Sequence, residues 1–196
     1  MKSRYGVEMG WYDLTYKEQG GVCAICSSGT PGGNGVRFQV DHDHDTGQVR
    51  GLLCARCNLG IGELKDSIEV LLSATAYIED AMCSDIDVLG RVCNKTNGTE
   101  ANSHYVGKLR ISDTEKQKLL VKQGNKCKIC KIELIKKHTD LDHCHETGKI
   151  RGFLCSQCNH GIGRFRDSLE LLDKAVDYLK KYAWDENYFD IFRRPW

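Results

Sequence analysis

Apolar and polar positions along the chain predict the same order of elements twice. A mixed apolar and polar stretch at residues 11–19, followed by a glycine pair, predicts a first helix, and residues 112–123 predict its counterpart. Ser112 and Glu115 have the spacing of a capping box, which marks the start of the second of these helices. Both stretches lead directly into a Cys-x-x-Cys pair.

Short apolar runs after these pairs predict a β-hairpin in each half, with a Thr-Gly turn dipeptide between its strands. Further along, apolar positions at helical spacing follow Asp66 and Asp167, each of which is expected to cap a helix. We therefore expect two helices behind each hairpin. The four expected strands are residues 36–40, 49–53, 139–141 and 150–154.

An internal repeat explains the doubled pattern. Residues 41–80 and 142–181 are identical at twenty of forty positions, at a constant offset of 101. The 196-residue chain therefore divides into two small units, whose mutual orientation a long polar linker leaves open. The predicted boundaries are residues 1–83 for the first unit, 84–107 for the linker, 108–183 for the second unit and 184–196 for an aromatic-rich tail.

Eight of the eleven cysteines form four Cys-x-x-Cys pairs, two in each unit. Four thiolates at this spacing are typical of a structural, tetrahedral Zn²⁺ site, and small units often need such a staple. Redox-active or free cysteine pairs are the alternative. We predict two structural Zn²⁺ ions, with these ligands: Cys23, Cys26, Cys54 and Cys57 for the first, and Cys127, Cys130, Cys155 and Cys158 for the second.

The net charge of +1 conceals a difference between the two halves. Residues 1–100 carry 9 Lys and Arg against 14 Asp and Glu, a net −5, whereas residues 101–196 carry 19 against 13, a net +6. The second half is therefore the better candidate for holding a polyanion. Residues 1–6 lack the apolar run of a signal peptide, and no stretch has membrane-spanning length. We therefore expect an intracellular, reducing, cytoplasmic setting without membrane contact.

Each unit also offers one Asp, two His and one Asn around the second cysteine pair. Carboxylate and amide oxygens suit a hard cation such as Mg²⁺ or Mn²⁺. A neighbouring His that titrates near neutral pH can take a proton from water, which predicts phosphodiester hydrolysis. These residues are Asp41, His42, His44 and Asn58 in the first unit and Asp142, His143, His145 and Asn159 in the second.

Several segments of the first unit form one framework: Arg4-Tyr5-Gly6, Cys23-x-x-Cys26, Asp41-His42-Asp43-His44, and Val49-Arg50-Gly51 leading into Cys54-x-x-Cys57-Asn58. This framework resembles the recombination endonuclease VII family of the His-Me finger (HNH, ββα-metal) nucleases. The resemblance covers roughly residues 4–82 and 108–182. It implies an α+β fold of two zinc-stapled ββα-metal units with flanking helices.

The resemblance also implies roles for single residues. One Asp and one Asn of each unit would bind the catalytic Mg²⁺ or Mn²⁺, the first His would be the general base, and the second His would be accessory. An Arg in the returning strand would contact a DNA phosphate, with a surface ion pair as the alternative. In order, these residues are Asp41, Asn58, His42, His44 and Arg50, or Asp142, Asn159, His143, His145 and Arg151.

The tandem arrangement departs from the family, whose branch-resolving members are expected to be homodimers with one unit per chain. It implies a covalent pseudo-dimer, and a homodimer of such chains stays open. The leading prediction is a metal-dependent endonuclease on branched DNA of the Holliday-junction type. The alternatives are a sequence-specific restriction or homing endonuclease and a zinc DNA-binding module without catalysis. The sequence leaves open whether one or both units are catalytic.

Overall fold

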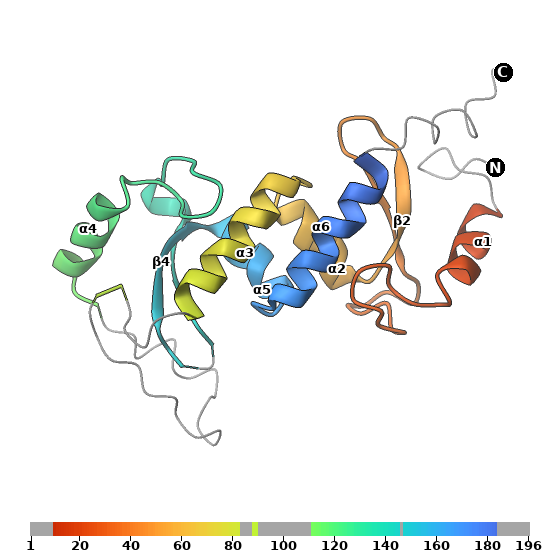
Figure 1. The fold of residues 1–196 in the computed structure, drawn as a ribbon, viewed down its shortest axis with the longest axis horizontal. Coiled ribbons are helices and arrows are strands. Elements are labelled where there is room, and N and C mark those ends of the chain that lie inside the picture. Colours follow the sequence, from red (N-terminus) through yellow and green to blue (C-terminus); the bar gives the residue numbers. More distant parts are fainter. Residues whose placement is uncertain (1–9, 83–87, 90–110, 146, 184–196) are drawn as a thin grey trace.

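The computed structural model describes residues 10–82, 88–89, 111–145 and 147–183 (Figure 1). It confirms the α+β fold and the repeated order of elements. The first copy consists of α1 (Trp11–Glu18), β1 (Gln39–His42), β2 (Val49–Leu53), α2 (Ala55–Glu63) and α3 (Ile68–Met82). The second consists of α4 (Asp113–Lys122), β3 (Thr139–His143), β4 (Ile150–Cys155), α5 (Ser156–Arg164) and α6 (Leu169–Ala183), with a short 3-10 turn (Lys136–His138) before β3.

The first helix of each copy is tied to its hairpin by a glutamine at the end of the helix. In the first copy, the Gln19 amide donates to the Leu52 carbonyl at 2.9 Å and accepts from the Leu52 N–H at 2.9 Å. Gln123 makes the same pair of bonds to Phe153, at 3.0 and 3.1 Å. The predicted capping box at Ser112 is confirmed, because its side chain accepts from the Glu115 N–H.

Each hairpin is a two-stranded antiparallel sheet. Strand β2 has the predicted bounds, whereas β1 begins three residues later than predicted and continues to His42. Strands β3 and β4 begin where predicted and extend to His143 and Cys155. Both first strands therefore include the Asp-His pair, which fixes these two side chains on regular backbone.

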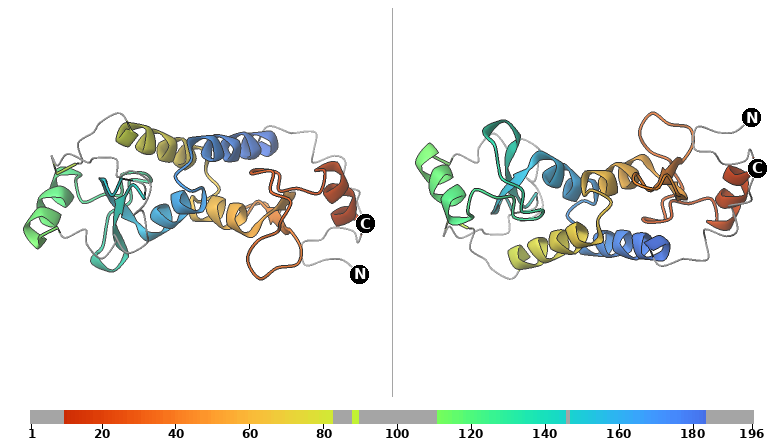
Figure 2. Two further views of the ribbon diagram at one scale, coloured as in Figure 1. Left: turned by 90° about the horizontal axis from the view of Figure 1, so that it is seen from below. Right: turned by 90° about the horizontal axis from the view of Figure 1, so that it is seen from above.

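The last helix of each copy lies over the hairpin of the other copy, contrary to the expectation that both helices back their own hairpin. Figure 2 shows α3 alongside the half that contains β3 and β4, and α6 alongside the half that contains β1 and β2. Helices α3 and α6 pack against each other, as do α2 and α5. One continuous core results, to which both copies contribute fully buried side chains such as Leu52, Leu71, Leu154 and Leu172.

Two glycines allow the close contact between α2 and α5. A Cβ added at Gly60 would lie 2.8 Å from a ring carbon of Phe165, and one added at Gly161 would lie 2.7 Å from Cγ of Leu64. Leu64 and Phe165 occupy equivalent positions of the repeat and are both fully buried. A glycine that packs against a large side chain of the other copy therefore occurs twice in the contact between α2 and α5.

Most of the predicted linker and the whole predicted tail lie outside the described residues. Within the linker range, Val88 and Leu89 pack against a small cluster of the second copy, and the Val88 N–H donates to the Ile150 carbonyl at 3.3 Å. Among the helices of the described residues, none is long and apolar enough to cross a membrane.

Candidate active site

Two groups of four cysteines are assembled as predicted. In each group all four Sγ atoms lie within 4.8 Å of one another, and the members are the eight predicted ligands. The Cys26–Cys54 and Cys130–Cys155 Sγ distances are both 3.7 Å. Four Zn–S bonds of about 2.3 Å in a tetrahedron give S–S separations of about 3.8 Å, so these groups fit a structural Zn²⁺ ion.

The local structure brings the sulfur atoms together in the same way in both copies. One cysteine pair lies in the turn after α1 or α4, and the other begins α2 or α5, where Cys54 and Cys155 are the N-cap residues. Hydrogen bonds from Cys23 and Cys57 lower the pKa of Cys54 to about 3, whereas hydrogen bonds with Cys23 and Cys54 raise the pKa of Cys57. Adjacent thiolates repel each other, and a bound cation removes this repulsion.

A β-bulge shapes the hairpin of the first copy at the candidate site. Asp41 pairs with Gly51 and His42 pairs with Val49, so Arg50 is an extra residue in the returning strand. Its guanidinium group turns inward and binds Asp41 through two hydrogen bonds, Nε to Oδ2 at 2.6 Å and Nη2 to Oδ1 at 3.0 Å. The bulge thus forms a bidentate ion pair inside the protein.

The second hairpin has the same bulge and the same pair. Arg151 donates to both oxygens of Asp142, at 2.7 and 2.8 Å. Only 3% of Asp142 and 5% of Arg151 is exposed, with the same values for Asp41 and Arg50. The ion pair that the sequence suggested as an alternative for these arginines is therefore present, but it is buried, which leaves little of either guanidinium group exposed to a DNA phosphate. They are buried structural partners of the aspartates, because the bulge points them inward.

Two further aspartates join the site, although the sequence predicted them to be helix caps. The caps are Ser67 and Ser168, whose Oγ atoms accept from backbone N–H groups three residues later at 3.2 and 3.3 Å. Asp66 instead binds Arg50 Nη2 at 3.0 Å and also contacts His44. This Asp recurs at the constant offset in the second copy, which could have indicated a role at the site. The serine that follows it is the helix cap, so the capping role had been assigned to the neighbouring residue.

Asp167 repeats this arrangement in the second copy. Its Oδ2 accepts from Arg151 Nη2 at 3.1 Å and lies 3.0 Å from His145 Nδ1. Its Oδ1 is buried and has no hydrogen-bond partner among the described residues. The second site therefore contains a buried carboxylate oxygen with an unused acceptor capacity.

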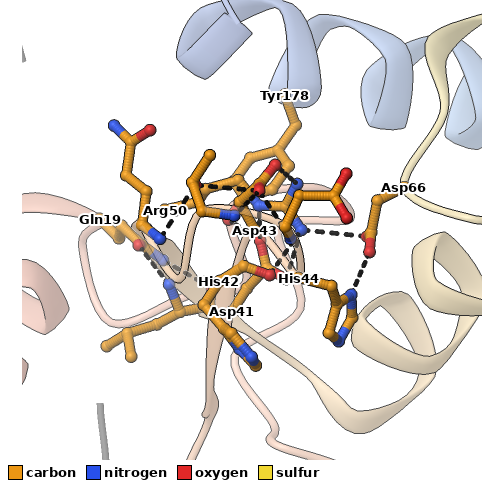
Figure 3. A network of polar contacts seen from close by, with 12 residues as sticks. Gln19, Asp41, His42, Asp43, His44, Arg50, Asp66 and Tyr178 are labelled. Carbon is orange, nitrogen blue, oxygen red and sulfur yellow. Dashed lines mark hydrogen bonds and ion pairs between the residues drawn. The ribbon is translucent and has the colours of Figure 1, made fainter.

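Each site is completed by a tyrosine from the other copy. Tyr178 on α6 donates to Asp41 Oδ2 at 2.8 Å, as Figure 3 shows, and Tyr77 on α3 donates to Asp142 Oδ2 at 2.7 Å. A Cβ added at Gly51 would lie 3.1 Å from the Tyr178 hydroxyl, so this glycine makes room for the contact. Sequence reasoning missed both tyrosines, although they occupy equivalent positions of the repeat.

The predicted histidines lie next to the aspartates, on the outer side of the hairpins. In the second copy the rings of His143 and His145 meet edge to face with centroids 5.1 Å apart, and the corresponding distance for His42 and His44 is 4.8 Å. Burial lowers the pKa of His143, and the neighbouring His145 lowers it further. His143 is therefore predominantly neutral at pH 7, as a proton acceptor must be.

One open pocket of about 1040 Å³ gathers the predicted residues of the second copy. Asp142, His143, His145 and Asn159 all line it, together with Asp167. An ionised carboxylate has about four acceptor positions, of which Asp142 uses three for Arg151 and Tyr77. One position remains for a cation, and the Asn159 amide oxygen in the lining of the same pocket is a second donor of the kind that a hard cation takes.

A known protein family matches both copies of the repeat. The recombination endonuclease VII family matches residues 1–80 and 102–181. The Gene 59 proteins of Mycobacterium phages D29 and L5 are 47% and 44% identical over 75 residues, which is 38% of this chain and 44% of each relative. The chain thus matches less than half the length of these relatives. No solved structure matches it.

The family match agrees with the geometry described above. It includes both cysteine groups, both bulged hairpins and both Asp-His pairs. It covers well over half of the sequence and treats the two copies alike. The chain therefore belongs to the recombination endonuclease VII family.

Proposed function

We propose that the protein is a metal-dependent endonuclease that hydrolyses phosphodiester bonds of branched DNA. The observation that carries the proposal is the pocket that gathers Asp142, His143 and Asn159 beside a buried arginine and a buried carboxylate. Such a pocket has a general base next to oxygen ligands, which are the two parts that metal-assisted hydrolysis requires. Family membership supports the same reaction class.

In this proposal Asp142 and Asn159 hold Mg²⁺ or Mn²⁺, as Asp41 and Asn58 do in the first copy. The cation, when bound, supplies charge stabilisation at the scissile phosphate. Arg151 and Tyr77 donate to the Asp142 carboxylate and fix its orientation. These two residues act through Asp142 and do not contact the DNA.

His143 removes a proton from the attacking water. Its lowered pKa keeps the imidazole neutral before the reaction, and Asp142 and Asp167 lie near enough to stabilise the imidazolium that forms. His145, held by Asp167, orients the neighbouring ring or the phosphate. His42 and His44 have the corresponding roles in the first copy. The proton later leaves His143 to solvent through the open pocket.

A covalent pseudo-dimer is part of the proposal. The shared core and the two tyrosine bonds between copies support it, because each copy needs the other to complete its site. Light scattering at micromolar concentration should give a mass near 22.1 kDa for one chain. Twice that mass would indicate that two chains associate into a homodimer.

The activity is tested with the full chain and Mg²⁺ or Mn²⁺ on a four-way DNA junction and on a mixed-sequence plasmid. We expect nicks near the junction, and their loss in a combined His42→Ala and His143→Ala variant. His138→Ala is the matched control, because His138 is exposed and lies outside the site. Discrete plasmid fragments would indicate a sequence-specific duplex enzyme instead. No cleavage of either DNA by the zinc-loaded protein would refute the proposal.

A further inference from the structure

Cationic side chains surround the pocket of the second copy. Arg164 and Arg166 line it at the end of α5, and His160 lines it one residue after Asn159. Arg56 also lines it, although Arg56 belongs to α2 of the first copy. The close packing of α2 against α5 brings this residue to a site that its own hairpin does not form.

Two of these guanidinium groups are not engaged elsewhere. Within the described ranges, Arg56 and Arg166 form no ion pair, and both side chains are exposed. Arg164 lies 3.6 Å from Glu63 of the first copy, so its charge is partly compensated. The pocket therefore has two guanidinium groups without an ion pair in its lining, together with the predicted metal ligands Asp142 and Asn159.

The equivalent positions of the first copy have a different character. Arg56, His160, Arg164 and Arg166 correspond at the offset of 101 to these residues: Gln157, Leu59, Glu63 and Lys65. Three arginines and a histidine are thus replaced by one lysine, one glutamate and two uncharged side chains. In addition, Asp43 lies 3.9 Å from Arg50, where the second copy has Cys144. Asp140, which also lines the second pocket, changes in the opposite direction because its equivalent is Gln39. The balance of these differences still leaves the first site more acidic.

We infer that the second site is the one that holds the scissile DNA strand, and that Arg56 binds a backbone phosphate there across the boundary between the copies. The inference rests on the proposed nuclease function and specifies which site performs it. A planar guanidinium group matches two phosphate oxygens, and a neutral protein must attract a polyanion through a local patch. Arg166 on the same rim binds the adjoining backbone.

Binding is measured first, with Ca²⁺ in place of Mg²⁺ so that the DNA stays intact. Fluorescence anisotropy of a labelled four-way junction over a salt series compares the wild type with Arg56→Gln, which introduces the residue found at position 157. We expect roughly tenfold weaker binding and a slope of log K against log salt that is smaller by about 0.9. Lys17→Gln removes one exposed charge from α1 and serves as the control.

Single-turnover cleavage with Mg²⁺ then ranks the two sites. His143→Ala should abolish most of the cleavage, whereas His42→Ala should leave most of it, and Arg56→Gln should slow the reaction in the His42→Ala protein. Equal losses from the two histidine variants would overturn the inference, as would an Arg56→Gln protein that binds like Lys17→Gln. In either case, cleavage by the wild type would leave the nuclease proposal standing. A wild type that does not cut but loses affinity through Arg56→Gln would refute the nuclease and retain the phosphate site.

Discussion

The first and second hairpins have the same interior and different rims. In both, a bulge places an arginine against a buried aspartate, and a tyrosine from the other copy donates to that aspartate. At the pocket rim, however, Arg56, Arg164 and Arg166 surround only the second site. The interior is held constant because a buried charge without its partner is very unfavourable. Exposed rim positions carry no such penalty, so they can diverge after a duplication.

Zinc removal should have the largest effect and tests whether the copies are independent. Because both copies share one core, Cys23→Ser and Cys127→Ser should each unfold the whole described region, with a loss on the order of 10 kcal/mol per structural zinc. Circular dichroism together with metal content measures this. Cys144→Ser is the control, since Cys144 lies outside both groups. Selective melting of one copy would show that the copies are separate folding units.

Removal of the buried arginines should have the next largest effect. Arg50→Ala or Arg151→Ala leaves Asp41 or Asp142 as an uncompensated buried charge, which should lower the free energy of unfolding by about 3–5 kcal/mol. Urea denaturation measures the change, with the exposed Arg37→Ala as control. Comparable losses in the two copies are expected from their equal burial. A loss no larger than that of the control would mean that the pair is not formed in solution.

The tyrosine bonds between copies should contribute less. Tyr77→Phe and Tyr178→Phe each remove a hydrogen bond to a buried charged group and should cost about 1.5–3 kcal/mol. Tyr16→Phe is the matched control, because Tyr16 is exposed. If the exchanged arrangement of α3 and α6 is correct, Tyr77→Phe on the first copy should also reduce cleavage by the second site, where Tyr77 donates to Asp142. A defect confined to the variant's own hairpin would contradict the exchange.

The pKa values of the same two tyrosines lead us to expect that the folded protein loses stability at high pH. Burial, and then the charge of the facing aspartate, raises the pKa of Tyr77 and of Tyr178 in the folded protein. Their stabilisation is complete below the unfolded-state pKa of about 10 and declines above it, because the unfolded chain releases the phenolic proton first. The wild type should lose about 1.4 kcal/mol per pH unit more than either phenylalanine variant above pH 10. Parallel pH profiles for wild type and variants would exclude this coupling.

The smallest expected effect concerns an ion pair between equivalent positions. Glu63 and Arg164 occupy the same place in the repeat and face each other at 3.6 Å. A double-mutant cycle with Glu63→Gln and Arg164→Gln should give a coupling of about 0.5 kcal/mol, because both groups are partly exposed. Two equivalent positions can form an ion pair only if they carry opposite charges. The pair therefore favours association of a first copy with a second copy over association of two identical copies. A coupling of zero would remove it as a reason for this pairing.

Short-range features were predictable because they depend on local spacing. The two groups of four cysteines, the capping box at Ser112 and strand β2 follow from short-range sequence patterns, and the structure confirms them. The burial of Arg50 and the capping role of Ser67 were not predictable in this way. A bulge adds one residue to a strand and so reverses the side of the hairpin to which the following side chains point. The first residue of a helix can likewise differ by one position from the residue that the sequence suggests. Each one-residue difference changed the inferred role of a charged side chain.

The sequence by itself determined that there are two equivalent hairpins, each beside a group of four cysteines and each with an Asp-His pair at the end of its first strand. The tertiary structure decided that α3 and α6 exchange hairpins, that Tyr77 and Tyr178 complete the opposite sites, and that Arg56 reaches the second pocket. The physical reason is that the spacing of apolar residues indicates which face of a helix is buried. It does not indicate which other element that face packs against. Hydrophobic burial has no direction, so the partner is chosen by the shape and polar contacts of the whole core.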